Sequence, residues 1–390
     1  MGGSSVNVYS VQVSGRVAQS LGTRMLKVSN LSRFSKSLVF AGMIAMVGVL
    51  ASCGGSIIGG PLSAEFVYIA TGTNVAQYAV SGNGQLVALN PASATSVNAV
   101  AMATDPAGKY LYAVNRSANT ISQFTVGGTG LLTAMTPTTI ATGSSPTAVA
   151  VSRDGKFVFA LNSADNTITG YTVGDTGLLT AIVATTPVAA DGSTLNITPN
   201  GSYLYATSYL GGKIDAFSIG TDGSLTPLST PSYTVGSSTG TSISPDGNFM
   251  YVPDSTNGVA QFSIGVDGSL TPLAPAVVAG PAGGNDTFAV TPDGKYGYLG
   301  SFNGGNPGSP VGQFSIGLNG ALTPLAPASV AAGNAPRHIA IEPLGKFLYV
   351  ANTNDGTVSQ FTIGSDGTLT ALSPSTVAVA GATQILIISR

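Results

Sequence analysis

The sequence predicts an all-β protein, a seven-bladed β-propeller with four strands in each blade. The first reason is a repeat of about 47 residues, which occurs seven times over residues 64–390. The second is that segments such as 156–163 and 346–353 place β-branched or aromatic residues at every second position, the period of a half-buried strand. The third is that no window of useful length has helical periodicity. Four-stranded units of this length are typical of propeller blades.

Tight turns mark the inner part of each repeat. The segment Pro292-Asp293-Gly294-Lys295 is an example. Proline presets φ, aspartate can bond to its own backbone, and glycine supplies a positive φ, so each such site predicts a hairpin turn. The six turn glycines, spaced 46 to 51 residues apart, are Gly108, Gly155, Gly201, Gly247, Gly294 and Gly345.

A second series marks the outer part of each repeat and occurs seven times. An aromatic residue is followed by Ile or Val, then by a glycine-containing turn and a leucine. The aromatic residues are Tyr78, Phe124, Tyr171, Phe217, Phe262, Phe314 and Phe361. The turn glycines of this series are Gly84, Gly130, Gly177, Gly223, Gly268, Gly320 and Gly367. The recurrence of the aromatic residues in register indicates packing between blades.

The sequence has six inner turns but seven outer turns, and this difference indicates how the ring closes. Residues 382–390 resemble the first strand of a repeat, such as residues 336–343, and residues 64–74 resemble a second strand. We therefore expect one blade to be shared between N-terminal and C-terminal strands, with the chain ends in place of the seventh turn. Such a ring has no free sheet edge to protect.

The composition excludes several classes of protein. Only 8% of the residues are charged, against about 25% in an average domain, which argues against coiled coils and basic nucleic-acid-binding proteins. The apolar content of 43% is too high for a disordered chain. With one His and one Cys, the chain cannot supply the ligands of a zinc site, and we expect no metal and no cofactor.

Residues 1–53 are predicted to be a targeting segment. They contain five of the 14 basic residues and none of the 16 acidic ones, followed by an apolar run over 38–50. This run is shorter than the roughly 20 residues of a membrane-spanning helix and is typical of a secretory signal. Met25 is a second candidate start. A glycine-rich linker is expected over 54–63.

Cys53 is the only cysteine in the chain. It follows Leu50-Ala51-Ser52 and precedes two glycines, which resembles the lipobox of bacterial lipoproteins. The resemblance implies a lipid on Cys53 and an exported protein anchored to a membrane, in the periplasm or at the cell surface. The alternatives are a buried free cysteine or an ordinary N-terminal anchor. The remaining chain has an acidic excess, so we expect no nucleic-acid partner.

The repeat motifs resemble those of the lactonase-like and YVTN-repeat propellers, which include 6-phosphogluconolactonase-like proteins and carboxymuconate cyclases. The segments that carry the resemblance are Pro292–Lys295, Tyr349–Asn352 and Ala335-Pro336-Arg337-His338. The resemblance implies that Arg337 and His338 lie at the mouth of the central channel.

The same resemblance directs attention to the asparagines that end second strands. The family tends to place a glutamate after this asparagine, whereas this chain has Thr353, Arg116 and Ser163 there. The chain has two glutamates, Glu65 at the start of a strand and Glu342 in an inner turn on the opposite rim. The candidate ligand-binding asparagines are Asn352, Asn115 and Asn162.

Lactone opening needs a base to activate water and a donor for the carbonyl oxygen. His338, with an ordinary pKa near 6.5, is the candidate base, and Arg337 is the candidate donor or anion-binding group. Asp286 stands as far before Gly294 as Arg337 stands before Gly345, so it is the candidate orienting acid. Alternatively, Asp286 and Arg337 form a plain ion pair between blades.

Three functions remain open at this point. The first is a module of the cell envelope that binds a small lactone, a sugar or an envelope protein. The second is a lactonase of the 6-phosphogluconolactonase type, motivated by Arg337 and His338. The third is a propeller kept as a spacer. The missing family glutamate favours the binding module and leaves the existence of an enzymatic activity open.

Overall fold

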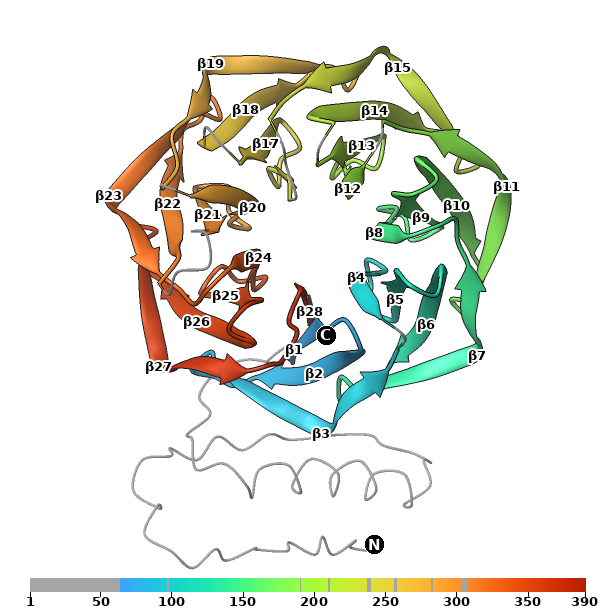
Figure 1. The fold of residues 1–390 in the computed structure, drawn as a ribbon, viewed down its shortest axis with the longest axis horizontal. Coiled ribbons are helices and arrows are strands. Elements are labelled where there is room, and N and C mark those ends of the chain that lie inside the picture. The colour runs from blue at the N-terminus through green and yellow to red at the C-terminus, as the bar shows by residue number, and fades with distance from the viewer. Residues whose placement is uncertain are drawn as a thin grey trace, which may run out of the picture. The chain divides into compact units, whose positions relative to one another are not determined.

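The computed structural model describes residues 64–390 apart from 97, 190, 210, 237–239, 256–257, 282 and 303–307. The described residues form seven four-stranded antiparallel sheets and no helix, so no helix in this part of the chain could span a membrane. The sheets stand around a central axis like the blades of a propeller (Figure 1). The predicted targeting segment and its linker lie outside the described residues.

The strands of each blade run from the channel outward. Blade 1 contains β28 (Gln384–Ser389), β1 (Glu65–Ala70), β2 (Asn74–Val80) and β3 (Leu86–Thr95). Blade 2 contains β4 (Ala99–Thr104), β5 (Tyr110–Asn115), β6 (Thr120–Val126) and β7 (Leu132–Ala141). Blade 3 contains β8 (Pro146–Val151), β9 (Phe157–Asn162), β10 (Thr167–Val173) and β11 (Leu179–Pro187). Blade 4 contains β12 (Gly192–Ile197), β13 (Tyr203–Ser208), β14 (Lys213–Ile219) and β15 (Leu225–Thr234).

The remaining blades repeat this order. Blade 5 contains β16 (Ser242–Ile243), β17 (Phe249–Asp254), β18 (Gly258–Ile264) and β19 (Leu270–Val278). Blade 6 contains β20 (Gly284–Val290), β21 (Tyr296–Phe302), β22 (Pro310–Ile316) and β23 (Leu322–Ala331). Blade 7 contains β24 (Pro336–Ile341), β25 (Phe347–Asn352), β26 (Thr357–Ile363) and β27 (Leu369–Ala378). The predicted fold, seven blades of four strands each, is confirmed.

Blade 1 combines strands from both ends of the propeller sequence. Strand β28 pairs antiparallel with β1 over six residue pairs, from Glu65 opposite Ser389 to Ala70 opposite Gln384. Beyond these pairs, the backbones of Ala64 and Arg390 exchange two hydrogen bonds of 2.8 and 2.9 Å. The innermost position of blade 1 is thus occupied, and the ring has no gap there.

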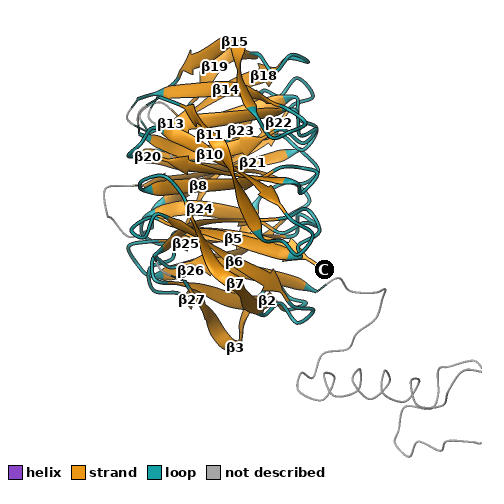
Figure 2. Ribbon diagram, turned by 90° about the vertical axis from the view of Figure 1, so that its right-hand side faces the viewer, coloured by secondary structure: helices purple, strands orange, loops and turns teal. Residues whose placement is uncertain are grey.

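The propeller has two faces, because neighbouring strands in a blade run in opposite directions. We call the face with the turns between first and second strands the turn face, and the other the crossover face, because there the chain passes from one blade to the next. Loops gather on two opposite sides of the strands (Figure 2). The six predicted turn glycines all have positive φ, between 62° and 77°. Ala64 and Arg390 also lie on the turn face, because they occupy the place of the seventh turn.

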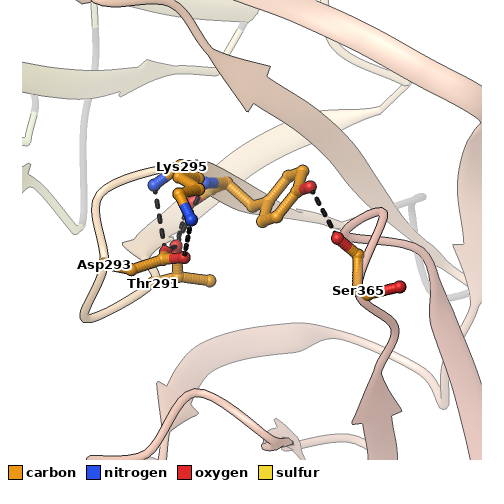
Figure 3. A network of polar contacts seen from close by, with 5 residues as sticks. Thr291, Asp293, Lys295 and Ser365 are labelled. Carbon is orange, nitrogen blue, oxygen red and sulfur yellow. Dashed lines mark hydrogen bonds and ion pairs between the residues drawn. The ribbon is translucent and has the colours of Figure 1, made fainter.

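The turn around Asp293 shows how local sequence builds this face (Figure 3). The Asp293 carboxylate accepts hydrogen bonds from the Thr291 hydroxyl (2.7 Å) and the Lys295 backbone N–H (3.1 Å). The Lys295 ammonium lies 3.4 Å from the same carboxylate. The Tyr296 hydroxyl donates to the Ser365 carbonyl (3.0 Å) in blade 7. The predicted turn chemistry therefore holds, and the turn also contacts the next blade.

The core lies between blades, because each sheet buries its two faces against its neighbours. Seven outer-turn glycines receive an aromatic ring from the preceding blade. At Gly130, whose φ is 79°, an added Cβ would lie 2.1 Å from the Phe66 ring. The glycine is thus required by its conformation and by the close approach of the ring.

Buried tyrosines form hydrogen bonds across six of the seven junctions between blades. Each donates its hydroxyl to the carbonyl of the outer-turn glycine in the following blade, at 2.6 to 2.8 Å. The tyrosines are Tyr68, Tyr112, Tyr205, Tyr251, Tyr298 and Tyr349. Burial raises the pKa of these hydroxyls, so they remain protonated donors.

Buried glutamines form a second set of bonds between blades. Each side-chain carbonyl accepts the backbone N–H of a leucine in the following blade, at 2.6 to 2.8 Å. Each amide also donates to a proline carbonyl in its own blade, 14 residues later. The glutamines are Gln77, Gln123, Gln261, Gln313 and Gln360. In blade 4 the Tyr233 hydroxyl replaces the glutamine and accepts the N–H of Leu270 at 2.9 Å.

The junction between blades 3 and 4 differs from the others. Phe159 occupies the position of the bonding tyrosines, and Gly170 occupies the position of the glutamines. Neither side chain has a polar atom, so blade 3 supplies neither type of bond from these positions. Both of these types of bond are therefore missing at this junction.

The substitution Phe159→Tyr should stabilise the protein by about 1 kcal/mol, the usual net value of a hydrogen bond, by adding the missing bond to the Gly223 carbonyl. The matched control is Tyr205→Phe, which removes the 2.7 Å bond to Gly268 and should cost about as much. Urea unfolding followed by circular dichroism measures both. Equal or lower stability of Phe159→Tyr would show that the hydroxyl does not account for the difference between junctions.

Candidate functional site

A cavity of 310 Å³ occupies the crossover-face half of the central channel. The first residues of the innermost strands line it, so all seven blades contribute. Most of the polar lining groups are neutral hydroxyls and amides, including Thr147, Thr194, Asn196, Thr241, Thr287 and Gln384. Arg337 is the only residue with a permanent charge among the described residues that line it.

Arg337 and His338 both line this cavity, at the start of β24. Arg337 is the extra residue of a β-bulge, because Pro336 and His338 pair with the adjacent residues Asn352 and Ala351. A bulge turns one side chain out of the regular alternation. The Arg337 side chain is exposed, and its planar guanidinium can bind a carboxylate, a phosphate or a carbonyl oxygen through two hydrogen bonds.

The same bulge recurs in four other innermost strands. Its extra residues there are Val100, Thr147, Ser193 and Asp286. Asp286 is therefore structurally equivalent to Arg337 in the adjacent blade, as its distance from the turn glycine indicated. It is only 9% exposed and is not among the residues that line the cavity. Asp286 therefore occupies the expected strand position, and its side chain is nearly buried.

His338 packs against the closing strand. Its Nδ1 accepts the backbone N–H of Ile385 in β28 at 3.4 Å, which leaves the ring proton on Nε2. Burial lowers the pKa of the His338 imidazole from 6.5 to about 4. The unperturbed value of 6.5, on which the choice of His338 as the candidate base was founded, thus does not apply in this environment. At neutral pH, His338 is an uncharged donor toward the channel and a weak base.

The three asparagines have a different role from the predicted one. Asn352, Asn115 and Asn162 are fully buried and absent from the cavity wall. Each side-chain amide donates to two hydroxyls on the neighbouring third strand of its own blade, at 2.8 to 3.2 Å. Because they hold second strands to third strands, we correct their assignment from ligand binding to blade packing.

Two features of the channel were missed by sequence reasoning. The Gln384 side chain bonds to both backbone groups of Met102, accepting the N–H at 2.5 Å and donating to the carbonyl at 3.3 Å, which ties blade 1 to blade 2. Thr241 bonds to Thr194 at 3.1 Å and accepts from the Asn196 amide. A lone glutamine or threonine in a repeat carries no sequence signal that would distinguish it from a surface residue.

The two glutamates form a pair at the turn face. Glu342 is 1% exposed and accepts the backbone N–H groups of its own turn, including that of Leu344 at 2.7 Å. Glu65, on the first residue of β1, hydrogen-bonds to it across the junction of blades 7 and 1. Burial, followed by the charge of Glu342, raises the pKa of Glu65 to about 7. This pair lies on the turn face, the face opposite the start of β24 with Arg337, as predicted for Glu342.

No group of three His, Cys, Asp or Glu side chains suited to a metal ion occurs in the described part of the chain. The crossover-face cavity is lined by neutral groups that can form hydrogen bonds and by one guanidinium. Such a set fits a small polyhydroxylated molecule with one negative or carbonyl group.

Replacement of His338 should change the acid stability of the protein. The folded pKa of about 4 lies below the unfolded value of 6.5, so protonation favours the unfolded chain. The stability that the neutral His338 imidazole provides is complete above pH 6.5 and is lost as the pH falls toward 4. We therefore expect the free energy of unfolding, measured with urea, to fall less between pH 7 and pH 4.5 for His338→Gln than for the unchanged protein. An equal loss in both would mean that His338 titrates normally in the folded state.

Solved structures with this architecture include lactonases. A protein of Bacteroides fragilis, provisionally assigned as a 6-phosphogluconolactonase, is 23% identical, with a TM-score of 0.73 over 84% of this chain and 98% of its own. A similarly assigned protein of Bacteroides uniformis is 21% identical, with a TM-score of 0.70 over 84% of this chain and 100% of its own. A periplasmic gluconolactonase of Pseudomonas aeruginosa is 19% identical, with a TM-score of 0.70 over 84% of this chain and 99% of its own. At these identities the likeness concerns the fold.

None of the curated proteins compared with the chain matches it significantly in sequence. A family model described as a lactonase with a seven-bladed β-propeller, however, matches residues 68–193, 135–301 and 191–385. Together these matches cover nearly the whole propeller. With the seven blades and with Arg337 and His338 at the start of β24, they show that the chain belongs to the lactonase family of seven-bladed β-propellers.

Proposed function

We propose that this protein is an exported, lipid-anchored propeller of the cell envelope that binds a small sugar acid or its lactone in the crossover-face cavity. The observation that carries the proposal is the placement of one guanidinium in a cavity otherwise lined by neutral hydroxyls and amides. The hydroxyls and amides can exchange hydrogen bonds with the hydroxyl groups of a sugar. Arg337 supplies the charge-assisted bond to a carboxylate, a phosphate or a lactone carbonyl.

Anchoring is supported by the N-terminal sequence and by the position of Ala64. The basic segment, the short apolar run and the single cysteine at Cys53 together resemble a lipoprotein signal. The chain enters blade 1 at Ala64 on the turn face, whereas Arg337 lies at the other end of the channel. A tether through Cys53 would thus be attached to the face opposite the proposed binding site.

A second candidate is hydrolysis of a sugar lactone. It is favoured by the family and by the proximity of Arg337 to His338, since Arg337 could polarise a lactone carbonyl and His338 could accept a proton from water. The low pKa of His338 argues against an efficient base, because a general base works best with a pKa near the working pH. Binding without turnover therefore fits the site better.

Arg337→Gln should weaken binding of gluconate and 6-phosphogluconate by ten-fold or more, because a hydrogen bond to a charged group contributes about 1.5–3 kcal/mol. Isothermal titration calorimetry on the purified protein measures the change. Arg153→Gln is the matched control, since Arg153 lines a separate 480 Å³ cavity at the turn-face end of the channel. Equal losses in both variants, or no binding by the unchanged protein, would contradict the proposed site.

The same preparations distinguish the two candidates. A pH-stat assay with gluconolactone and 6-phosphogluconolactone should show no rate above spontaneous hydrolysis if the protein only binds. Catalysed hydrolysis that falls 100-fold or more in His338→Gln would instead establish the lactonase, because general acid–base catalysis contributes about 10²–10⁴-fold.

Cys53→Ser should move the protein out of the membrane fraction or leave it as an unprocessed precursor, because the serine hydroxyl cannot accept the lipid. Fractionation of cells together with mass spectrometry of the N-terminus measures both outcomes. Ser52→Ala is a suitable control, since it leaves the cysteine in place. A variant that remains processed and membrane-bound would show that Cys53 is not the anchor.

A further inference from the structure

A cavity of 250 Å³ lies between the outer strands of blades 3 and 4. Blade 3 lines it with residues of β9, β10 and β11, and blade 4 contributes its outer turn and the start of β15. The walls are mainly apolar, and no charged residue is among the described residues that line it. They include Phe159, Ile168, Gly170, Ile182, Ala184 and Leu225.

Three positions in blade 3 carry smaller or less polar residues than their equivalents. Gly170 precedes Tyr171 where five blades have a glutamine before the aromatic residue. Ala184 lies 14 residues after Gly170, the spacing at which those glutamines meet a proline. Phe159 stands where six blades have a tyrosine. The cavity lies where the larger groups would be.

Two backbone groups border this cavity at positions where other junctions form hydrogen bonds. Leu225 is equivalent to leucines such as Leu179, whose N–H bonds to the Gln123 carbonyl at 2.8 Å. Gly223 is equivalent to glycines such as Gly177, whose carbonyl accepts the Tyr112 hydroxyl at 2.6 Å. Both Leu225 and Gly223 line the cavity. By analogy with the other junctions, the group that suits this cavity is a carboxamide whose carbonyl faces the Leu225 N–H.

We propose that this cavity is a binding site for a small, neutral carboxamide with an apolar body, whose carbonyl accepts the Leu225 N–H as a glutamine side chain does in other blades. An ionised ligand is excluded, because the apolar walls would leave its charge without a partner. The volume suffices for a ring, since a cavity of about 150 Å³ with apolar walls holds benzene. Benzamide joins an aromatic ring to the required group and is the probe.

The test is thermal unfolding of the full-length protein with increasing benzamide. Saturable binding should raise the unfolding temperature by about 2 °C at ten times the dissociation constant. Benzoate, which has the same shape but a charge, should give no saturable shift, and toluene, which lacks the carbonyl, should bind at least five-fold more weakly. The proposal would be overturned if toluene bound as tightly as benzamide, or if benzamide gave no saturable shift of the unfolding temperature.

Two variants locate the site. Gly170→Gln places a carboxamide in the cavity and should abolish the benzamide response, whereas a retained response would overturn the assignment. Because an added Cβ at Gly170 lies 3.2 Å from Ile182, this variant requires Ile182 to shift. The second variant, Gln123→Gly/Pro137→Ala, copies two of the three blade 3 residues into blade 2 and should gain a second saturable binding event. If this variant folds but does not bind a second benzamide molecule, the proposed match between a carboxamide ligand and the leucine N–H would also be wrong.

Discussion

The structure depends on the packing of each blade against the next, and hydrogen bonds to the backbone of the following blade direct this packing at six of the seven junctions. A single four-stranded sheet has two apolar faces and cannot bury both alone, so every blade needs two neighbours. Tyrosine hydroxyls and glutamine amides direct this packing, because each finds its partner only when two blades are in one relative position. They also satisfy buried backbone groups in a protein with very few charges. The ring is thus specified by polar groups inside an apolar interface.

The fold was predictable because its signals are local and repeated. Turn glycines such as Gly294 need a positive φ wherever they occur, so their spacing reveals the blades directly. The position of Arg337 at the channel was implied by the resemblance of Ala335-Pro336-Arg337-His338 to a family motif, and the structure has Arg337 as the second residue of an innermost strand. The pKa of His338 was not, because the strand that buries it comes from another blade, 47 residues later. The burial of Asn352, likewise, depends on hydroxyls of a neighbouring strand.

The channel has two chemically different ends. The crossover-face end offers neutral hydroxyls and amides with the Arg337 guanidinium. The turn-face end has a separate cavity, which is lined by Asp105, Arg153 and uncharged residues. The two ends of the channel therefore carry different sets of charged groups.

The position of β28 sets the order of events during biogenesis. This strand follows all the others in the chain, yet it occupies the innermost place beside β1. Blades 2 to 7 are therefore complete before the residues that join blade 7 to blade 1 are delivered. Until this last strand is available, blade 1 lacks its innermost strand and the ring cannot close. Ring closure is therefore the last step in the assembly of the propeller.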